Sequence, residues 1–240
     1  MRRILVLLLF LSVALTSFSG TRTLLSDLRT DAFDRKTGVR LYTEARKQTD
    51  YPDRPGIWHF TYSDELGKTI VQRSVNFEKD MIKPDFKLND LRNGYSEGAE
   101  VIASGIRVFS GGSPNEPMEH KLLIVPEPAV IDAGFNFFIE KNWDRLMNGE
   151  VLSFNFVAPS QLDYFSLRVY KKHETIWRGR PAVVINMDVD NFLIRLFVEA
   201  IHMTYDTSSR KLLLYDGISN IYDAEGKSHK VTMEFNYKDP

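Results

Sequence analysis

The sequence has no cysteine, and it lacks most of the residue patterns that carry catalysis. Without cysteine there is no disulfide, no thiol nucleophile and no cysteine-ligated metal, so the fold depends on its core. The five histidines stand singly, and no two have the H-x-x-x-H or H-x-H spacing that places both imidazoles on one metal. A G-x-S-x-G nucleophile elbow is also missing. We therefore expect a non-enzymatic protein that uses no cofactor and no metal.

Positive charge is not in excess either. The chain has 31 lysines and arginines against 32 aspartates and glutamates. Proteins that bind phosphate backbones carry strongly basic surfaces, because binding depends on neutralising the phosphates. We therefore expect that nucleic acid is not a partner.

Long apolar runs are absent except at the N-terminus. Residues 4–15 are apolar, two arginines precede them and small residues follow, which is typical of a secretory signal peptide. We expect residues 1–19 to be removed and residues 20–240 to form a single β-rich domain in the bacterial periplasm. Removal leaves 29 basic residues against 32 acidic ones. A bilayer span needs about 20 apolar residues, so we expect no transmembrane segment in the mature chain.

Most of the remaining sequence alternates between apolar and polar residues, which is the period of a half-buried strand. Residues 57–77 contain two such runs around the turn-like "SDELGK", and this pattern predicts an antiparallel hairpin. Further alternating runs follow at 152–157, 165–169 and 183–189. Short connections favour antiparallel pairing, and we count about eight to eleven strands.

One segment shows a clear helical period. In "DAGFNFFIEKNWDRLMNGE" the apolar residues recur at three- and four-residue intervals, which predicts one main helix over about 133–148. Asp132 is suitable as its N-cap and Gly149 as the residue after its C-terminus. A short helix or an ordered lead-in is expected at 20–37, and a short buried helix at 192–197 that leads into a strand at 202–205. The predicted fold is mainly β, a single large curved antiparallel sheet, half-barrel-like, packed on this main helix plus short helices.

Three stretches suggest relatives. "AGFNFFIEKNWDRLMNGE", "FNFVAPSQLDYF" and "LLLYDGISNI" resemble motifs of a family of exported, uncharacterised bacterial proteins, over roughly residues 130–237. The order of elements also resembles the lipoprotein-localisation-factor superfamily, which includes periplasmic lipoprotein carriers. That second resemblance implies a half-barrel of antiparallel strands closed by helices around a lipid-accepting cavity.

The helix aromatics are the best candidates for contacts with a ligand. A curved sheet whose helical plug is incomplete leaves an apolar cavity. Phe135, Phe138, Ile139 and Trp143 from the helix, with Tyr164 at a strand entrance, would line it. The alternative for all five is that they are ordinary core residues.

Two acidic stretches are candidates for polar sites. Asn186, Asp188 and Asp190 share one face of a strand, where they could hold a cation or serve acid–base chemistry; we favour their being the solvent side of a half-buried strand. In the stretch 212–237 only three residues fit a calcium-binding loop. "DAEGK" is better interpreted as a hairpin turn, and Gly217 as a bulge or a close backbone approach.

Two arginines, Arg178 and Arg180, stand in a turn-like segment. They could grip an anionic head group, but we favour solvated turn residues.

The sequence supports three functions in order. The first is a non-enzymatic periplasmic protein that binds a lipid-like or other hydrophobic ligand in the concave face of the sheet. The second is a cell-envelope scaffold or assembly protein that binds a protein partner and no small molecule. An enzyme using Asp188 and Asp190 ranks last.

Overall fold

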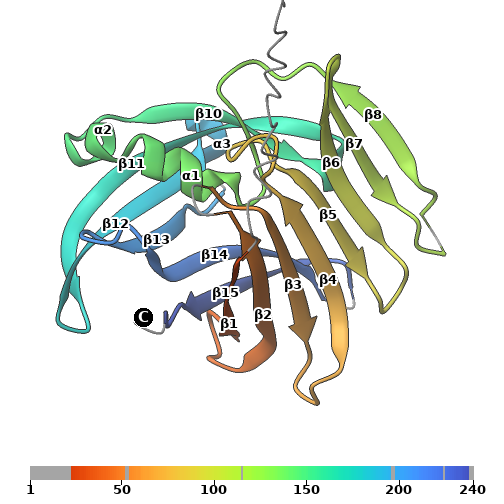
Figure 1. Cartoon of the computed structure of the whole chain (residues 1–240), viewed down its shortest axis with the longest axis horizontal. Helices are drawn as coiled ribbons and strands as arrows, with labels where there is room; N and C mark the ends of the chain where they lie inside the picture. The colour runs from red at the N-terminus through yellow and green to blue at the C-terminus, as the bar shows by residue number, and fades with distance from the viewer. Residues whose placement is uncertain (1–22, 52–53, 115, 196–197, 224, 238–240) are drawn as a thin grey trace, which may run out of the picture.

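The protein is one large curved sheet that does not close on itself (Figure 1). Its computed structural model describes residues 23–51, 54–114, 116–195, 198–223 and 225–237. Strands make up 59% of the structure. The predicted fold class, mainly β with one large curved antiparallel sheet, is confirmed.

The elements follow one another with short connections, as the alternating pattern indicates. In the described residues the strands are β1 (Thr23–Asp34), β2 (Arg40–Asp50), β3 (Ile57–Ser63), β4 (Thr69–Asn76), β5 (Asp85–Asp90), β6 (Ser96–Ile102), β7 (Gly105–Gly111), β8 (Glu119–Leu123), β9 (Ala129–Ile131), β10 (Leu152–Ala158), β11 (Asp163–Trp177), β12 (Arg180–Val189), β13 (Ile201–Asp206), β14 (Leu212–Tyr222) and β15 (Ser228–Glu234). The helices are α1 (Gly134–Lys141), α2 (Trp143–Met147), the 3-10 turn η1 (Pro159–Gln161) and α3 (Phe192–Arg195).

The sheet runs in the order β8-β7-β6-β5-β4-β3-β2-β1-β15-β14-β13-β12-β11-β10-β9. Consecutive strands pair antiparallel along most of it, and β1 joins the two halves by pairing with both β2 and β15. The pair β9–β10 is parallel. The two ends of the sheet, β8 and β9, are not paired with each other, although η1 lies against β6 and β7.

The main helix predicted over about 133–148 is present, but it is divided into two short helices, α1 and α2. α1 and α2 are separated at Asn142, whose φ of −105° and ψ of 18° depart from helical values. The side-chain amide of Asn142 donates to the carbonyl oxygen of Phe138 at 2.9 Å. Asparagine competes with helical backbone hydrogen bonds in this way, which favours a break.

The helix also begins differently from the prediction. Ala133 is the N-cap of α1, and no side chain caps it. Asp132 has a φ of 42° and reaches the guanidinium of Arg73 instead. The predicted end is confirmed, because Gly149 follows α2 with a φ of 87°, which glycine adopts readily.

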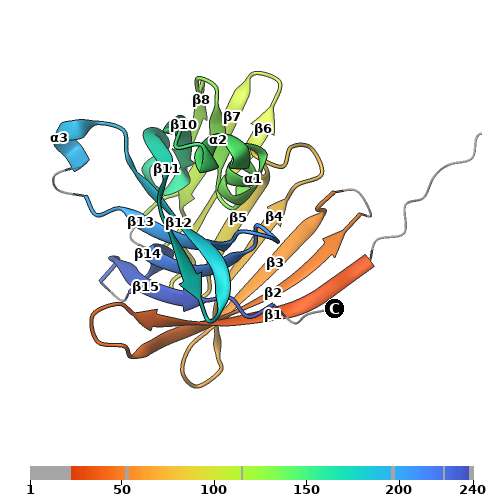
Figure 2. The same cartoon turned by 90° about the vertical axis from the view of Figure 1, so that its left-hand side faces the viewer.

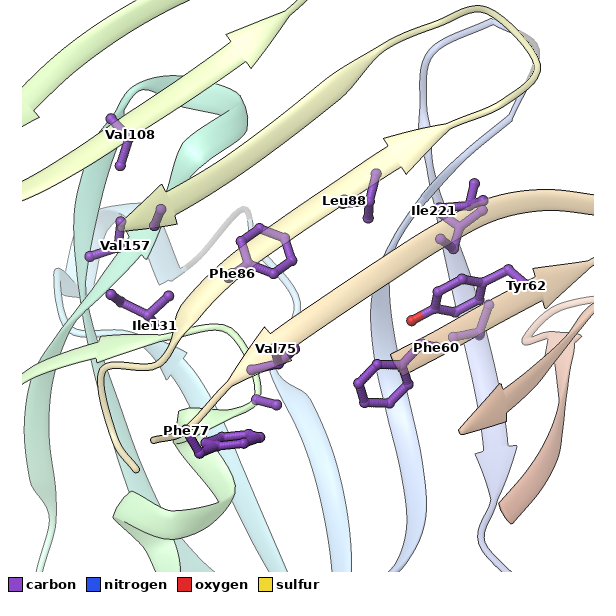
Figure 3. Close-up of a cluster of buried hydrophobic side chains, with 14 of the residues drawn as sticks. Phe60, Tyr62, Val75, Phe77, Phe86, Leu88, Val108, Ile131, Val157 and Ile221 are labelled. Atoms are coloured by element: carbon purple, nitrogen blue, oxygen red, sulfur yellow. The ribbon is translucent and has the colours of Figure 1, made fainter. Parts of the chain in front are cut away.

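α1 lies between the two halves of the curled sheet, as Figures 1 and 2 show. Phe137 packs on Trp58 and Phe77, with ring centroids 5.8 and 5.1 Å apart. Phe138 and Ile139 are buried against side chains of β10–β13. α1 therefore joins two hydrophobic clusters. The larger one draws its side chains from β1–β10, β14 and β15, and Figure 3 labels members of it from β3–β5, β7, β9, β10 and β14.

The segment 20–37, for which a short helix was expected, contains strand β1 from residue 23. β1 is paired on both sides, with β2 and with β15. Strand pairing along its length outweighs the weak helical spacing of its leucines.

The last hairpin forms as predicted. Asp223 Oδ1 accepts hydrogen bonds from the backbone N–H groups of Glu225 and Lys227 at 3.0 and 2.8 Å, and Gly226 has a φ of 76°. At Gly217 a β-carbon would lie 2.9 Å from the side chain of Ile201, so the glycine allows a close approach.

Among the described residues, no helix is long and apolar enough to cross a membrane. The predicted signal peptide, residues 1–19, lies outside the described residues.

Candidate functional site

The five residues predicted to line a cavity do not gather around one space. Phe138, Ile139 and Trp143 are buried, and Phe135 packs half-buried against the same cluster under the helices. Tyr164 is half-buried at the start of β11, opposite Val157. The helix aromatics therefore serve first as core, and Phe138 also borders a hollow of the described structure that is large enough for a ligand.

That hollow has a volume of about 530 Å³ and lies beside the junction of α1 and α2. Residues 80–83 between β4 and β5, the residues 127–129 that lead into β9, and the residues 151–153 at the start of β10 form its other walls. Pockets for small ligands commonly measure about 300–1,000 Å³. The hollow is therefore of suitable size for one amphiphilic molecule.

Its floor is apolar. Ala129, Phe138 and Leu152 are buried at its base, and Ile82 is half-buried beside them. Val151, with 54% of its surface exposed, stands at the edge. An acyl chain placed in the hollow would remove its own apolar surface from water, together with that of Val151 and part of Ile82.

The rim of the hollow carries Lys83, Lys141 and Arg145 together with two acids. Lys83 Nζ lies 2.5 Å from Glu127 Oε1 and 3.9 Å from a carboxylate oxygen of Asp80. The hydrogen bond from Lys83 holds the pKa of Glu127 below its ordinary value. The two acids are thus engaged by one lysine.

The other two cations of the rim, Lys141 and Arg145, have fewer acidic partners than Lys83. Arg145 donates through Nε to Glu150 at 2.9 Å and through a terminal nitrogen to Asn142 Oδ1 at 3.2 Å, and it is exposed. Lys141 is exposed and has no ion-pair partner among the described residues. The hollow therefore offers a net positive rim above an apolar floor.

Backbone contacts hold the walls of the hollow in place. The N–H of Ile131 donates to the carbonyl oxygen of Ile82 at 3.0 Å. A β-carbon on Gly134 would lie 2.1 Å from that same oxygen, so only glycine lets α1 begin this close to the β4–β5 connection. Lys141 and Arg145, one on each side of the break at Asn142, both line the hollow.

A second feature, which sequence reasoning missed, is a buried ionic cluster on the inner face of β2–β6. The guanidinium of Arg73 lies 3.2 Å from Asp132 Oδ1 and 3.9 Å from Glu44 Oε2, and all three side chains are 11% exposed. It also stacks on the ring of Phe60, 3.8 Å from the centroid. Burial lowers the pKa of Arg73, but the adjacent Asp132, Tyr62 and Glu44 more than offset this, so its pKa lies above the ordinary value.

Glu97 of β6 faces the same interior. It accepts a hydrogen bond from Tyr95 Oη at 2.8 Å, and that hydroxyl is also 2.9 Å from Ser110 Oγ. Burial raises the pKa of Glu97 to about 7; the charge of Asp132 acts in the same direction, whereas the Tyr95 hydrogen bond and the charge of Arg73 oppose it. Glu97 therefore holds a proton under mildly acidic conditions.

Three buried polar atoms of this cluster have no hydrogen-bond partner among the described residues: Arg73 Nε, Asp132 Oδ2 and Tyr62 Oη. Such atoms are rare in folded proteins and carry a desolvation cost. The cluster is thus more costly to bury than a fully paired one.

The favoured interpretation of Asn186, Asp188 and Asp190 as the solvent side of a strand is correct only for Asp190, which follows β12, because Asn186 and Asp188 are buried. Asp188 is buried, with its Oδ1 2.6 Å from Arg168 Nε and its Oδ2 accepting from Tyr170 Oη at 3.2 Å. Asp190 is exposed. The row is therefore a structural ionic network, in which Asp188 faces neither free solvent nor a cavity.

Asn186 belongs to the same network and lies beside a histidine. Its Oδ1 is 2.7 Å from His202 Nδ1. Burial lowers the pKa of His202. Across the described parts of the chain, no three histidine, aspartate or glutamate side chains stand close enough together to hold a metal ion.

Of the two arginines predicted to be turn residues, Arg178 is in the turn between β11 and β12, whereas Arg180 is the first residue of β12. Arg178 has a φ of 49° between β11 and β12 and forms an ion pair with Glu234. Its side chain is 62% exposed, in keeping with the interpretation we favoured.

Comparisons of this chain with protein-family models, with curated proteins and with solved structures found no match. The two family resemblances therefore stay predictions.

Proposed function

We propose that this is an exported, non-enzymatic protein that binds a lipid-like ligand, and that the ligand is an anionic amphiphile held in the hollow beside α1 and α2. One observation carries the proposal: the hollow combines an apolar floor with a cationic rim. A fatty-acid or lysophospholipid molecule has these two properties in complementary form. Export rests on the N-terminal sequence pattern, and the expected location is the periplasm.

The apolar half of the ligand would lie over Phe138 and Leu152, beside Val151. Burying apolar surface is worth about 25 cal/mol per Å², so a few methylene groups suffice for measurable binding. The site differs from the one predicted from sequence, because the centre of the concave face is filled by the core clusters that flank α1.

The anionic half would face Lys141, with Arg145 next to it. Lys141 is the better anchor because no described acid pairs with it, whereas Glu150 engages Arg145. Lysine binds an anion as a point charge and so tolerates either a carboxylate or a phosphate.

Purification from the periplasm followed by native mass spectrometry and lipid extraction tests the proposal directly. We expect a co-purified amphiphile and a mature N-terminus after residue 19. A clean apo mass together with no uptake of oleate would contradict ligand binding and favour the scaffold alternative, in which the protein binds another protein.

A charge reversal then tests the site. Lys141→Glu should weaken oleate binding by about five- to tenfold, since an exposed charge contact is worth up to about 1 kcal/mol and the reversal adds repulsion. Binding of uncharged monoolein should not change. Lys121→Glu, on exposed β8 and away from the hollow, is the matched control and should bind both as the unmodified protein does. Equal loss in the two variants would show that overall charge, not this rim, controls binding.

A further inference from the structure

One end of the sheet is covered and the other is open. At the covered end, β9 is buried along its whole length, and the N–H of Ile131 donates to the carbonyl oxygen of Ile82 in the β4–β5 connection. At the open end, β8 pairs with β7 alone, and its first four residues are exposed. In Figure 1, β8 forms the outer margin of the sheet. Within the described part of the chain, the sheet therefore ends in a free strand edge.

The free edge of β8 carries one charge of each sign. Unpaired N–H and C=O groups make an edge strand a template for another strand, and proteins commonly protect such edges with lysine. Here Lys121 is accompanied by Glu119, and the two lie on the same face of β8, opposite Val108 and Ser110 of β7. Neither charge forms an ion pair with another described residue. The edge is therefore able to pair with a strand of complementary charge.

These charges select one way in which two copies of β8 can pair. In a continuous sheet, residues directly opposite each other lie on the same face, so a symmetric antiparallel pair is centred on one residue. A pair centred on His120 places Glu119 of each copy opposite Lys121 of the other. A pair centred on either charged residue places two like charges opposite each other, which is destabilising. The charges therefore favour the register centred on His120.

The apolar residues of the edge favour the same register. On the other face of the strand, it brings Met118, just before β8, opposite Leu122 of the second copy. These side chains are 39% and 49% exposed. Pairing would remove part of this apolar surface from water. One register thus satisfies the charges on one face and the apolar side chains on the other.

The covered end of the sheet limits assembly to two copies. A β8 edge that added to β9 of a neighbour would build an open chain, but the β4–β5 connection already occupies the outer side of β9. A contact between two β8 edges uses the same surface in both copies and closes as a dimer. Because β8 has only five residues, the interface is small, and we expect a dimer that dissociates at micromolar concentrations.

We propose that a second copy of this chain occupies the free edge of β8. The two copies form a dimer with one continuous sheet, through an antiparallel β8–β8 pair centred on His120. This inference adds a partner to the proposed function and does not depend on the ligand, because no residue of β8 lines the hollow.

An exchange of charges tests both the surface and the register. Lys121→Glu and Glu119→Lys each create two like-charge contacts, and each should raise the Kd of the dimer about thirtyfold in sedimentation velocity. An equal mixture of the two variants should form heterodimers as tight as the unmodified dimer, because every acid again meets a lysine. Lys68→Glu, at an exposed position between β3 and β4, makes the same charge change and should leave the Kd unchanged.

The absence of cysteine allows a second, covalent test. In the proposed register, His120→Cys places two thiols opposite each other, at a Cα separation of about 4.5–5.5 Å, which suits a disulfide. We expect mild oxidation to give a covalent dimer, and the further substitution Lys121→Glu to slow its formation. Leu66→Cys, at a turn position that is 94% exposed, is the matched control and should stay monomeric. All these positions are exposed, so the variants should keep the circular dichroism spectrum of the unmodified protein.

Several outcomes would overturn the proposal. They are an unmodified protein that stays monomeric at every concentration tested, a dimer that Lys121→Glu leaves intact, and a mixture of the charge variants that associates no better than either alone. Disulfide formation at 66 as fast as at 120 would also overturn it, as would a cross-linker at 120 that captures a different protein in cells and no second copy. None of these assays measures oleate uptake, so this proposal and the ligand proposal can fail separately.

Discussion

Two ionic networks in this sheet use similar residues in opposite ratios. On the inner face, one cation, Arg73, serves two acids, Glu44 and Asp132. On the outer face, one acid, Asp188, serves two cations, Arg168 and Arg195. The inner side chains are all 11% exposed, whereas the outer arginines are 27% and 18% exposed around Asp188, which is 7% exposed.

The comparison shows how burial sets the cost of an ion pair. Water can hydrate the outer arginines if their partner is lost, but it has little access to the inner acids. Breaking a buried pair by removing one partner leaves an uncompensated charge, which commonly costs 3–5 kcal/mol, while exposed pairs are worth about 1 kcal/mol or less. The inner network should therefore dominate both stability and its dependence on pH.

The largest expected effect is that of Arg73→Met. It leaves Glu44 and Asp132 buried without a cation, and we expect the free energy of unfolding to fall by about 3–5 kcal/mol. Urea denaturation at pH 7 measures this. Arg168→Met is the matched control and should cost about 1 kcal/mol, because Asp188 keeps Arg195. If the free energy of unfolding fell equally in the two variants, the inner network would not matter more for stability than the outer one.

The next effect concerns pH and Glu97. Its pKa in the folded protein is about 7, above the ordinary 4.5, because of burial. The folded state therefore keeps a proton that the unfolded chain releases, so this contribution to stability is complete below about pH 4.5. It is lost as the pH rises to about 7, by roughly 3 kcal/mol at most.

Glu97→Gln removes this titration. The difference in free energy of unfolding between the unmodified protein and the variant, measured in urea from pH 4.5 to 7.5, should fall as the pH rises. A difference that stays constant over this range would show that Glu97 does not hold its proton in the folded state.

The smallest effect is expected on the outer network. Asp188→Asn loses charged hydrogen bonds and should lower the free energy of unfolding by about 1–2 kcal/mol. Asp190→Asn, at an exposed position, should change it by less than about 0.5 kcal/mol. Neither variant should alter oleate binding. Loss of function in a variant that stays folded would support the enzyme alternative.

Much of the fold follows from local patterns. The hairpin of β3 and β4, the turn at Asp223 and the end of α2 at Gly149 depend on residues next to one another in sequence. So does the α3–β13 segment, where a short helix leading into a strand was expected. The break at Asn142 was missed because the apolar period continues through it, although an asparagine in mid-helix was an available signal.

The sites were harder to foresee. Arg73 and Asp132 are 59 residues apart, and nothing in either local sequence indicates that they meet. Alternation tells which residues share a face of a strand, but it does not tell which strands become neighbours. The hollow was equally hard to predict, because its walls come from four separate segments that only the fold brings together.

The sequence by itself determined the class of the protein: period-two alternation and well-placed turn residues specify strands and hairpins through local sterics, and the lack of cysteine leaves stability to the core. Tertiary structure decided which strand lies beside which, and therefore which charges are buried together and where a hollow remains. The reason is physical. Backbone preference acts within a few residues, whereas burial and charge pairing depend on distances that exist only once the sheet has curled around α1.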